Sequence, residues 1–201
     1  MYCPSCEHRL EAGPERCDLC GFHLEALDVR YGEGPVAMDQ ITDTTHFLRT
    51  RDRDHLLDII DAFETQFPQL YPAFYIAELP ADAKLPEFAT WLINRARVSV
   101  LDELREGQNA YLFVIDLTSQ SMTVTAGYFA EQFVSENDLR ELLEDAAPYV
   151  AAGDLREGLS KLIENLRLVL RRNYRLILKS MKPGGPLATR EPNKLGRPLV
   201  D

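Results

Sequence analysis

YLFVIDLTSQSMTVTAGYFAE, residues 111–131, sets the architecture of this chain. The segment begins with five apolar residues, continues through the mainly polar residues 116–121, and then alternates polar and apolar side chains up to Gly127. Successive side chains of a strand point to opposite faces of its sheet, so residues 111–115 present apolar groups to both faces. Such a strand is typical of the middle of a sheet that helices cover on both sides.

Asp116 stands where this strand ends, at the kind of sheet edge where α/β proteins usually bind ligands. Two known site patterns come close but lack a required residue. The start of a phosphoaspartate enzyme needs a second Asp where Thr118 stands, and a metal-ion-dependent adhesion loop needs a hydroxyl where Gln120 stands. The sequence therefore favours a hairpin turn in which the Asp side chain bonds to the backbone.

The segments around this hairpin alternate between strand and helix patterns. Strands are expected at 44–48 and 73–78, and helices at 50–66, 86–98, 135–147 and 154–180. The first of these helices has an apolar stripe, and Ser135 with Asp138 matches a capping box. We therefore predict an α/β fold, with a small mixed sheet of about four strands and helices on both faces.

All four cysteines lie near the N-terminus, as the pairs Cys3/Cys6 and Cys17/Cys20. Two C-x-x-C knuckles supply four thiolates, which is the ligand set of a closed, tetrahedral structural Zn²⁺ site. Gly21 suits the tight turn after the last cysteine. A segment of about 24 residues cannot build a hydrophobic core, so metal binding would supply its folding free energy. A redox C-x-x-C pair is the alternative, but that motif normally occurs once, beside a βαβ unit.

The histidines add little to this picture. His8 and His23 each follow a cysteine closely and could replace one as a ligand, but we expect both to face solvent. His46 and His55 lie near the start of the α/β domain, and His55 is expected to be solvated rather than catalytic.

Composition excludes several classes of protein. No run of about 18 apolar residues occurs, and the N-terminus shows no signal-peptide pattern, so we expect a chain that is neither exported nor membrane-spanning. Cysteines kept for a metal favour the reducing cytoplasm. The sequence lacks G-x-x-x-x-G-K-[ST], G-x-G-x-x-G and G-x-S-x-G, which argues against a nucleotide-phosphate cradle and a serine hydrolase.

The chain divides into four predicted segments. These are a zinc-ribbon module at 1–24, a linker at 25–42, an α/β domain with a long C-terminal helix at 43–180, and a disordered tail at 181–201. The linker contains the breaker Tyr-Gly-Glu-Gly-Pro, and the tail is rich in Pro and Gly.

Charge is unevenly distributed. Residues 1–155 carry 11 Lys and Arg against 28 Asp and Glu, whereas residues 156–182 carry 8 against 2. Cations recur at every fourth position of the last predicted helix, at Arg167, Arg171, Arg175 and Lys179. A solvated helix face, whose cations suit the C-terminal end of the helix dipole, accounts for this stripe. The functional alternative is docking to an acidic partner, an anionic lipid surface or RNA.

Two further observations bear on partners. The acidic body and the lack of aromatic residues within the stripe argue against nucleic acid. The last helix would be roughly 40 Å long, more than a small sheet needs, so its far end is a candidate surface for a protein partner or for a dimer.

The order of elements resembles the TPM domain, which occurs in thylakoid lumen proteins and in many bacterial proteins. The apolar strand, the turn Asp and the Gly-Tyr-x-x-Glu pattern carry the resemblance, with matches at Gly127, Tyr128 and Glu131 and departures at Phe129 and Ala130. Trp91, Pro148 and the sequence after it add to it, and the resemblance covers roughly residues 40–180.

That resemblance implies a Rossmann-like α/β/α sandwich, a phosphatase activity reported for some members, and binding of Ca²⁺ or Mg²⁺ by acidic loop residues. On this chain the corresponding carboxylates are Asp43, Asp116, Glu131, Glu136 and Asp138. Phe129 replaces the second Gly of the family's Gly-Tyr-Gly, which removes backbone freedom from that loop.

Three hypotheses follow. The first is a zinc-binding interaction or scaffold module without a complete catalytic site. The second is a divalent-metal-dependent phosphatase of low specificity that uses the acidic loops. The third and weakest is nucleic-acid binding through the zinc ribbon and the basic helix.

Overall fold

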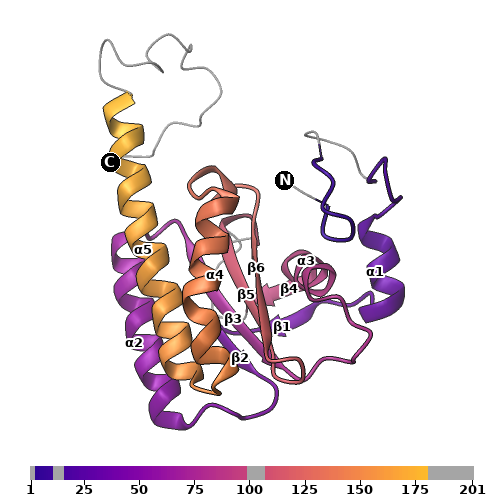
Figure 1. The fold of residues 1–201 in the computed structure, drawn as a ribbon, viewed down its shortest axis with the longest axis horizontal. Coiled ribbons are helices and arrows are strands. Elements are labelled where there is room, and N and C mark those ends of the chain that lie inside the picture. The colour runs from indigo at the N-terminus through magenta and orange to yellow at the C-terminus, as the bar shows by residue number, and fades with distance from the viewer. Residues whose placement is uncertain (1–2, 11–15, 99–106, 181–201) are drawn as a thin grey trace.

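The computed structural model describes residues 3–10, 16–98 and 107–180 of the chain. A four-stranded sheet in the order β2-β3-β5-β6 forms its centre (Figure 1). Strands β2 (Ile41–Asp43), β3 (Tyr71–Ala77) and β5 (Ala110–Asp116) are parallel, and β6 (Ser121–Ala126) is the antiparallel edge. The predicted mixed α/β sheet of about four strands is therefore confirmed.

The hairpin expected from the sequence is present as β5 and β6. Every residue of β5 is buried, as a strand with two covered faces requires. Its side chains pack into two separate hydrophobic clusters. Tyr111, Phe113 and Ile115 belong to one, whereas Leu112 and Val114 belong to the other.

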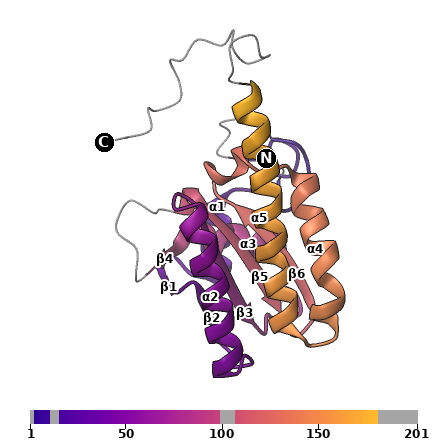
Figure 2. The ribbon, with the colours of Figure 1, turned by 90° about the vertical axis from the view of Figure 1, so that its left-hand side faces the viewer.

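Helices cover both faces of the sheet (Figure 2). One face carries α2 (Thr50–Gln66), α4 (Glu136–Ala151) and α5 (Leu155–Ser180), which lie side by side. The other carries α3 (Leu85–Arg95), with α1 (Leu24–Tyr31) packed beside it. The 3-10 turns η1 (Gly107–Asn109) and η2 (Ala130–Gln132) flank the hairpin.

The strand expected at 44–48 is wrong, because the strand lies just before it at Ile41–Asp43. The Asp43 carboxylate accepts hydrogen bonds from the backbone N–H groups of Thr45 (3.1 Å) and Leu48 (2.8 Å). A short polar side chain that bonds to the following backbone favours a turn over a strand. The apolar residues of this loop therefore belong to the turn that leads into α2.

Helix α4 starts as expected but continues beyond Pro148. Ser135 and Asp138 form both hydrogen bonds of the capping box. Pro148 lies in the last turn, and its carbonyl still accepts from the N–H of Ala152 at 3.1 Å, so the missing N–H of proline does not end the helix there. The helix ends before Gly153, whose φ is 75°.

The predicted linker at 25–42 contains regular structure. Helix α1 and strand β1 (Val36–Met38) lie within it, and β1 pairs in parallel with β4 (Ala96–Val98) as a separate two-stranded sheet. The predicted tail at 181–201 lies outside the described residues. Within the described ranges, no helix combines the length and the hydropathy needed to cross a bilayer.

Candidate metal centre

Each cysteine pair sits in the same backbone turn. The N–H of Cys3 donates to the carbonyl of His8, and the N–H of Glu7 donates to the carbonyl of Cys3, both at 2.8 Å. In the second turn Cys17 bonds to Phe22 and Gly21 bonds to Cys17 in the same way, again at 2.8 Å. The sequence thus forms two equivalent knuckles, each of which presents two sulfur atoms.

The residue after the second cysteine of each knuckle has a positive φ. Gly21 has φ 72°, which glycine adopts without steric cost. Glu7 holds the same position in the first knuckle with φ 58°, a conformation that costs an L-residue roughly 1–2 kcal/mol. The knuckle geometry is therefore kept even where the sequence does not favour it.

The four sulfur atoms lie together. All are within 4.8 Å of one another, with Cys3 and Cys20 at 3.6 Å and Cys6 and Cys17 at 3.8 Å. A tetrahedron with metal–sulfur bonds of about 2.3 Å has edges of about 3.8 Å, so the thiols fit a bound metal ion. Cys3 and Cys17 are buried, and Cys20 is exposed. These four residues could hold a metal ion.

Without a metal the thiols perturb one another. The backbone N–H of Phe22 and the neighbouring sulfurs lower the pKa of Cys20 to about 7. The backbone N–H of His8 acts to lower the pKa of Cys6, but burial and the other sulfurs outweigh it and raise that pKa to about 12. One ionised thiol thus opposes the ionisation of its neighbours. A divalent cation would stabilise all four thiolates together, and their protons would be released when it binds.

The two nearby histidines lie outside this group. His8 faces Asp18, with 3.5 Å between Nε2 and Oδ1. His23 uses Nδ1 to contact the carbonyl of Gly21 at 2.9 Å and stands before α1 as its N-cap. Among the described residues, the cysteines are the one group of three or more His, Cys, Asp or Glu side chains with converging ligand atoms.

Helix α1 attaches the knuckles to α3. Asp28 accepts hydrogen bonds from Arg95 and from the indole N–H of Trp91, which also donates to the carbonyl of Gly32 at 3.1 Å. Tyr31 packs edge-on against Phe88, with ring centroids 5.1 Å apart. Sequence reasoning missed the pairing of Asp28 with Arg95, because an ion pair between residues 67 positions apart has no local sequence signal.

The predicted acidic residues separate into two groups at opposite ends of the sheet. Asp43 and Asp116 end β2 and β5, on either side of β3, so they share the carboxyl edge of the parallel strands. Glu131, Glu136 and Asp138 follow β6, which runs the other way and ends beside the start of β5. The structure therefore does not bring the five carboxylates to one place, and the cation site stays a prediction.

Asp116 makes the turn that the sequence favoured. The residue is 7% exposed, and its carboxylate accepts from the backbone N–H groups of Leu79 (3.0 Å) and Thr118 (3.0 Å), and from the hydroxyl of Ser119 at 2.5 Å. Burial acts to raise the pKa of Asp116, but these hydrogen bonds outweigh it and hold the pKa below its usual value. The same balance lowers the pKa of Asp43.

At the other edge, Asp138 is also engaged, because it closes the capping box and pairs with Arg172 of α5. Glu131 differs, since burial and the nearby Glu136 carboxylate raise its pKa. Within the described residues neither Glu131 nor Glu136 forms an ion pair.

The basic stripe is only partly described. Arg171 is exposed, whereas Arg167 is half-buried and its Nε has no hydrogen-bond partner in the described part of the chain. The side chains of Arg175 and Lys179 lie outside the described residues, so the stripe as a partner site stays a prediction.

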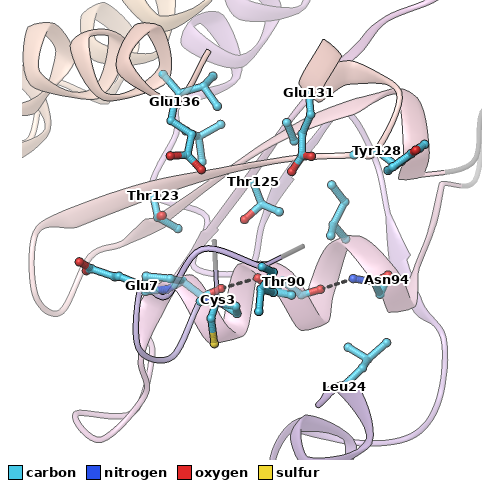
Figure 3. Close-up of a pocket in the computed structure, with 18 of the residues that line it drawn as sticks. Cys3, Glu7, Leu24, Thr90, Asn94, Thr123, Thr125, Tyr128, Glu131 and Glu136 are labelled. Carbon is cyan, nitrogen blue, oxygen red and sulfur yellow. Dashed lines mark hydrogen bonds between the residues drawn. The ribbon is translucent and has the colours of Figure 1, made fainter. Parts of the chain in front are cut away.

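An open cleft of about 1030 Å³ lies between the knuckles, α3, β6 and the start of α4 (Figure 3). Thr123 and Thr125 of β6 line it, and Glu131 and Glu136 point into it. Sequence reasoning did not anticipate this cleft, because its walls come from four separate parts of the chain.

Comparison with known proteins agrees with the fold. Residues 41–169 match the family model of the TPM domain, named TPM_phosphatase. Among curated proteins, none matches the chain.

Three solved structures of bacterial proteins are similar. The N-terminal domain of a protein from P. gingivalis is 18% identical, with a TM-score of 0.53 over 68% of this chain and 84% of its own. The N-terminal domain of the cg2496 protein from Corynebacterium glutamicum is 12% identical, with a TM-score of 0.51 over 65% and 78%. The BA42 protein from Bizionia argentinensis is 13% identical, with a TM-score of 0.52 over 65% and 86%. At these identities the likeness supports the fold alone.

Proposed function

The chain belongs to the TPM domain family through residues 41–169, and from this premise we propose that it is a cytoplasmic protein-interaction module whose knuckles are held by a structural Zn²⁺ ion. The observation that carries the proposal is the group of four thiols on a segment attached to the family domain. Chemistry that needs a convergent site has no comparable group among the described side chains.

Zinc is the metal that this donor set favours. Four thiolates in two C-x-x-C knuckles fill all the positions of a tetrahedral ion, which suits a structural site rather than a catalytic one with an open position. The two sulfur pairs, at 3.6 and 3.8 Å, already have nearly the spacing that zinc requires. Free thiols at this spacing also favour a reducing compartment, which supports the cytoplasm.

The role of the ion is to fix a surface. Helix α1 begins four residues after Cys20, and its Asp28 and Tyr31 contact α3. Zinc would hold the knuckles in one conformation beside α3, and the knuckles and the family domain would then present a continuous surface to a partner. Zinc supplies folding free energy to the knuckles when bound.

The test measures zinc and partner binding together. Purified wild-type protein is expected to hold about one equivalent of zinc, and Cys17→Ser less than about half. His8→Ala is the matched control, because His8 lies beside the knuckle without joining the sulfur group. Partners captured by the zinc-loaded protein and lost with Cys17→Ser support the proposal. Zinc-free wild-type protein, or capture unchanged by Cys17→Ser, contradicts it.

A divalent-metal-dependent phosphatase is the second candidate. One observation favours it: Asp43 and Asp116 end two strands that flank β3, at the edge where α/β folds bind ligands. Carboxylate oxygens there suit Ca²⁺ or Mg²⁺. The turn hydrogen bonds that both side chains accept weigh against it, because a cation would have to share those oxygens.

Hydrolysis of p-nitrophenyl phosphate in Ca²⁺ or Mg²⁺ decides this second candidate. Activity that Asp116→Asn and Asp43→Asn abolish, and that the exposed control Asp58→Asn keeps, would establish it. Equal rates in all four proteins would exclude it.

A further inference from the structure

The outer side of β6 is an unpaired sheet edge. In the described part of the chain, β6 pairs with β5 and with no other strand. The N–H of Gly127 donates to the carbonyl of Ala110 at 2.8 Å, and this bond shows which residues along β6 are hydrogen-bonded to β5. Bonded positions alternate along an antiparallel pair, so the N–H and C=O groups of residues 122, 124 and 126 point away from β5.

This edge opens into the cleft. The cleft extends along β6 between α3 on one side and the start of α4 on the other, and the first knuckle closes part of it through Cys3 and Glu7. Its volume of about 1030 Å³ exceeds most small-molecule pockets, which measure about 300–1,000 Å³. An exposed edge with free backbone groups is a template for another strand.

Among the side chains that line the cleft beside this edge, the carboxylates outnumber the cations. Glu131 and Glu136 point into the cleft over Thr125 and Thr123 (Figure 3), and Glu7 lies across from them. The lining also contains Arg97 and Arg140, but Arg140 turns to Glu144, with 3.7 Å between Nε and Oε1. An occupant with cationic side chains would pair with Glu131 and Glu136, which form no ion pair within the described ranges, whereas these carboxylates would repel phosphate groups.

We propose that an extended peptide segment of a partner protein, with Lys or Arg at alternate positions, adds to β6 as a fifth strand and fills this cleft. Backbone hydrogen bonds to residues 122, 124 and 126 would supply affinity, and cations opposite Glu131 and Glu136 would supply specificity. Side chains of a strand alternate, so every second residue of the segment faces the carboxylates. The inference rests on the proposed interaction function and names its site and the chemistry of its partner.

The first test uses the zinc-loaded full chain and a fluorescent peptide, acetyl-KTKVKT-amide. Fluorescence anisotropy is expected to show saturable binding, and the acidic counterpart acetyl-ETEVET-amide is expected to bind at least about tenfold more weakly. Equal binding of the two peptides, or of neither, overturns the proposal.

The second test asks whether the peptide binds as a strand, and it leaves the protein unchanged. Methyl groups on alternate backbone nitrogens along one edge of the peptide are expected to abolish binding, because they remove the donors that face β6. Methylation along the other edge is expected to preserve it. Hydrogen exchange by NMR should slow at the amides of Met122 and Val124 on binding. The amides of Thr123 and Thr125 should change little, because they already bond to β5. Loss with both methylated peptides, or no slowing at these amides, contradicts strand addition.

The third test removes the charges. The double variant Glu131→Gln and Glu136→Gln is expected to weaken binding about tenfold and to reduce its salt dependence. Glu164→Gln is the matched control, because Glu164 is exposed on α5 away from the cleft. A control variant that weakens binding equally would overturn the charge assignment.

Two further outcomes separate this inference from its premise and from a second copy. Zinc-loaded protein that captures partners through another surface, with no effect of acetyl-KTKVKT-amide as competitor, overturns the cleft proposal and leaves the interaction function standing. Sedimentation that shows a dimer, dissociated by the same peptide, would make a second copy the occupant and overturn the proposed partner.

Discussion

Arg95 of α3 holds Asp28 of α1 through two parallel hydrogen bonds, 2.8 Å from Nε to Oδ1 and 2.5 Å from Nη2 to Oδ2. The indole N–H of Trp91 reaches the same carboxylate at 3.2 Å. Arg95 holds the pKa of Asp28 below its usual value. A bidentate guanidinium–carboxylate pair fixes orientation as well as distance, so this contact sets how the knuckles lie against the family domain.

Asp28→Asn is expected to loosen α1 from α3, because it removes the charge that Arg95 pairs with and one of its two acceptor oxygens. Hydrogen exchange should accelerate at α1 amides while those of β3 and β5 stay protected. Glu25→Gln, an exposed change on the same helix, is the control. Unchanged exchange in Asp28→Asn would show that apolar packing alone holds α1.

Removing the glycine of one knuckle and adding a glycine to the other are expected to change zinc affinity in opposite directions. Gly21→Val is expected to weaken zinc binding about 5- to 30-fold, because a positive φ costs an L-residue about 1–2 kcal/mol and folding of the knuckle is coupled to the metal. No atom lies within 4 Å of a Cβ built at Gly21, so the effect is conformational rather than steric. Glu7→Gly is expected to strengthen zinc binding. Competition with a chromogenic chelator measures both, and a weaker Glu7→Gly site would refute the argument.

Asp116 predicts acid sensitivity. Its pKa is lowered in the folded state, so the unfolded chain takes up the proton first as the pH falls. The stability that this carboxylate contributes is fully present above the unfolded pKa of about 4 and is lost progressively below it. Asp116→Ala is expected to cost about 1–3 kcal/mol at pH 7, because buried N–H groups lose their acceptor.

Urea unfolding between pH 3 and pH 7 measures this prediction. The unfolding free energy of Asp116→Ala should fall less steeply with acid than that of the wild type, and Asp58→Asn should follow the wild type. Parallel curves for all three proteins would show that Asp116 does not contribute to the pH dependence.

Glu131 is expected to affect the pH dependence of stability in the opposite direction to Asp116. Burial raises its pKa, so the folded protein binds this proton more readily than the unfolded chain, and the charged form opposes folding at neutral pH. Glu131→Gln is therefore expected to raise the melting temperature by a few degrees at pH 8 and by nothing below about pH 4, where both states are protonated. Thermal unfolding at the two pH values, with Glu164→Gln as control, tests this. A lower melting temperature at pH 8 would contradict it.

Much of the central fold is predictable because its signals are local. Five apolar residues at 111–115 require cover on two faces, and the structure provides it. Helix α2 occupies the expected range, and the spacing of the four cysteines predicts that their sulfurs meet. Each of these features depends on residues close together in the sequence.

The parts that sequence reasoning missed depend on pairing between distant segments. Helix α1 has little amphipathic character of its own and is placed by contacts with α3, so its sequence resembles a connector. The family resemblance names five candidate carboxylates without saying whether they converge. They lie at two edges of the sheet, because the direction of β6 relative to its neighbours decides where the loop after it lies. Family resemblance identifies candidate residues, but it does not say where in the fold their side chains lie.

The attachment of the knuckles to α3 also has an order in time. Their hydrogen-bonded contacts with that part of the chain span 52 to 79 residues, from Arg30–Asp82 to Ser5–Lys84. During synthesis at about 5–20 residues per second, the four thiols leave the ribosome several seconds before α3 does. For that interval the nascent chain offers a complete zinc ligand set and no surface to receive it. A metal ion would therefore be captured before α3 is available for docking.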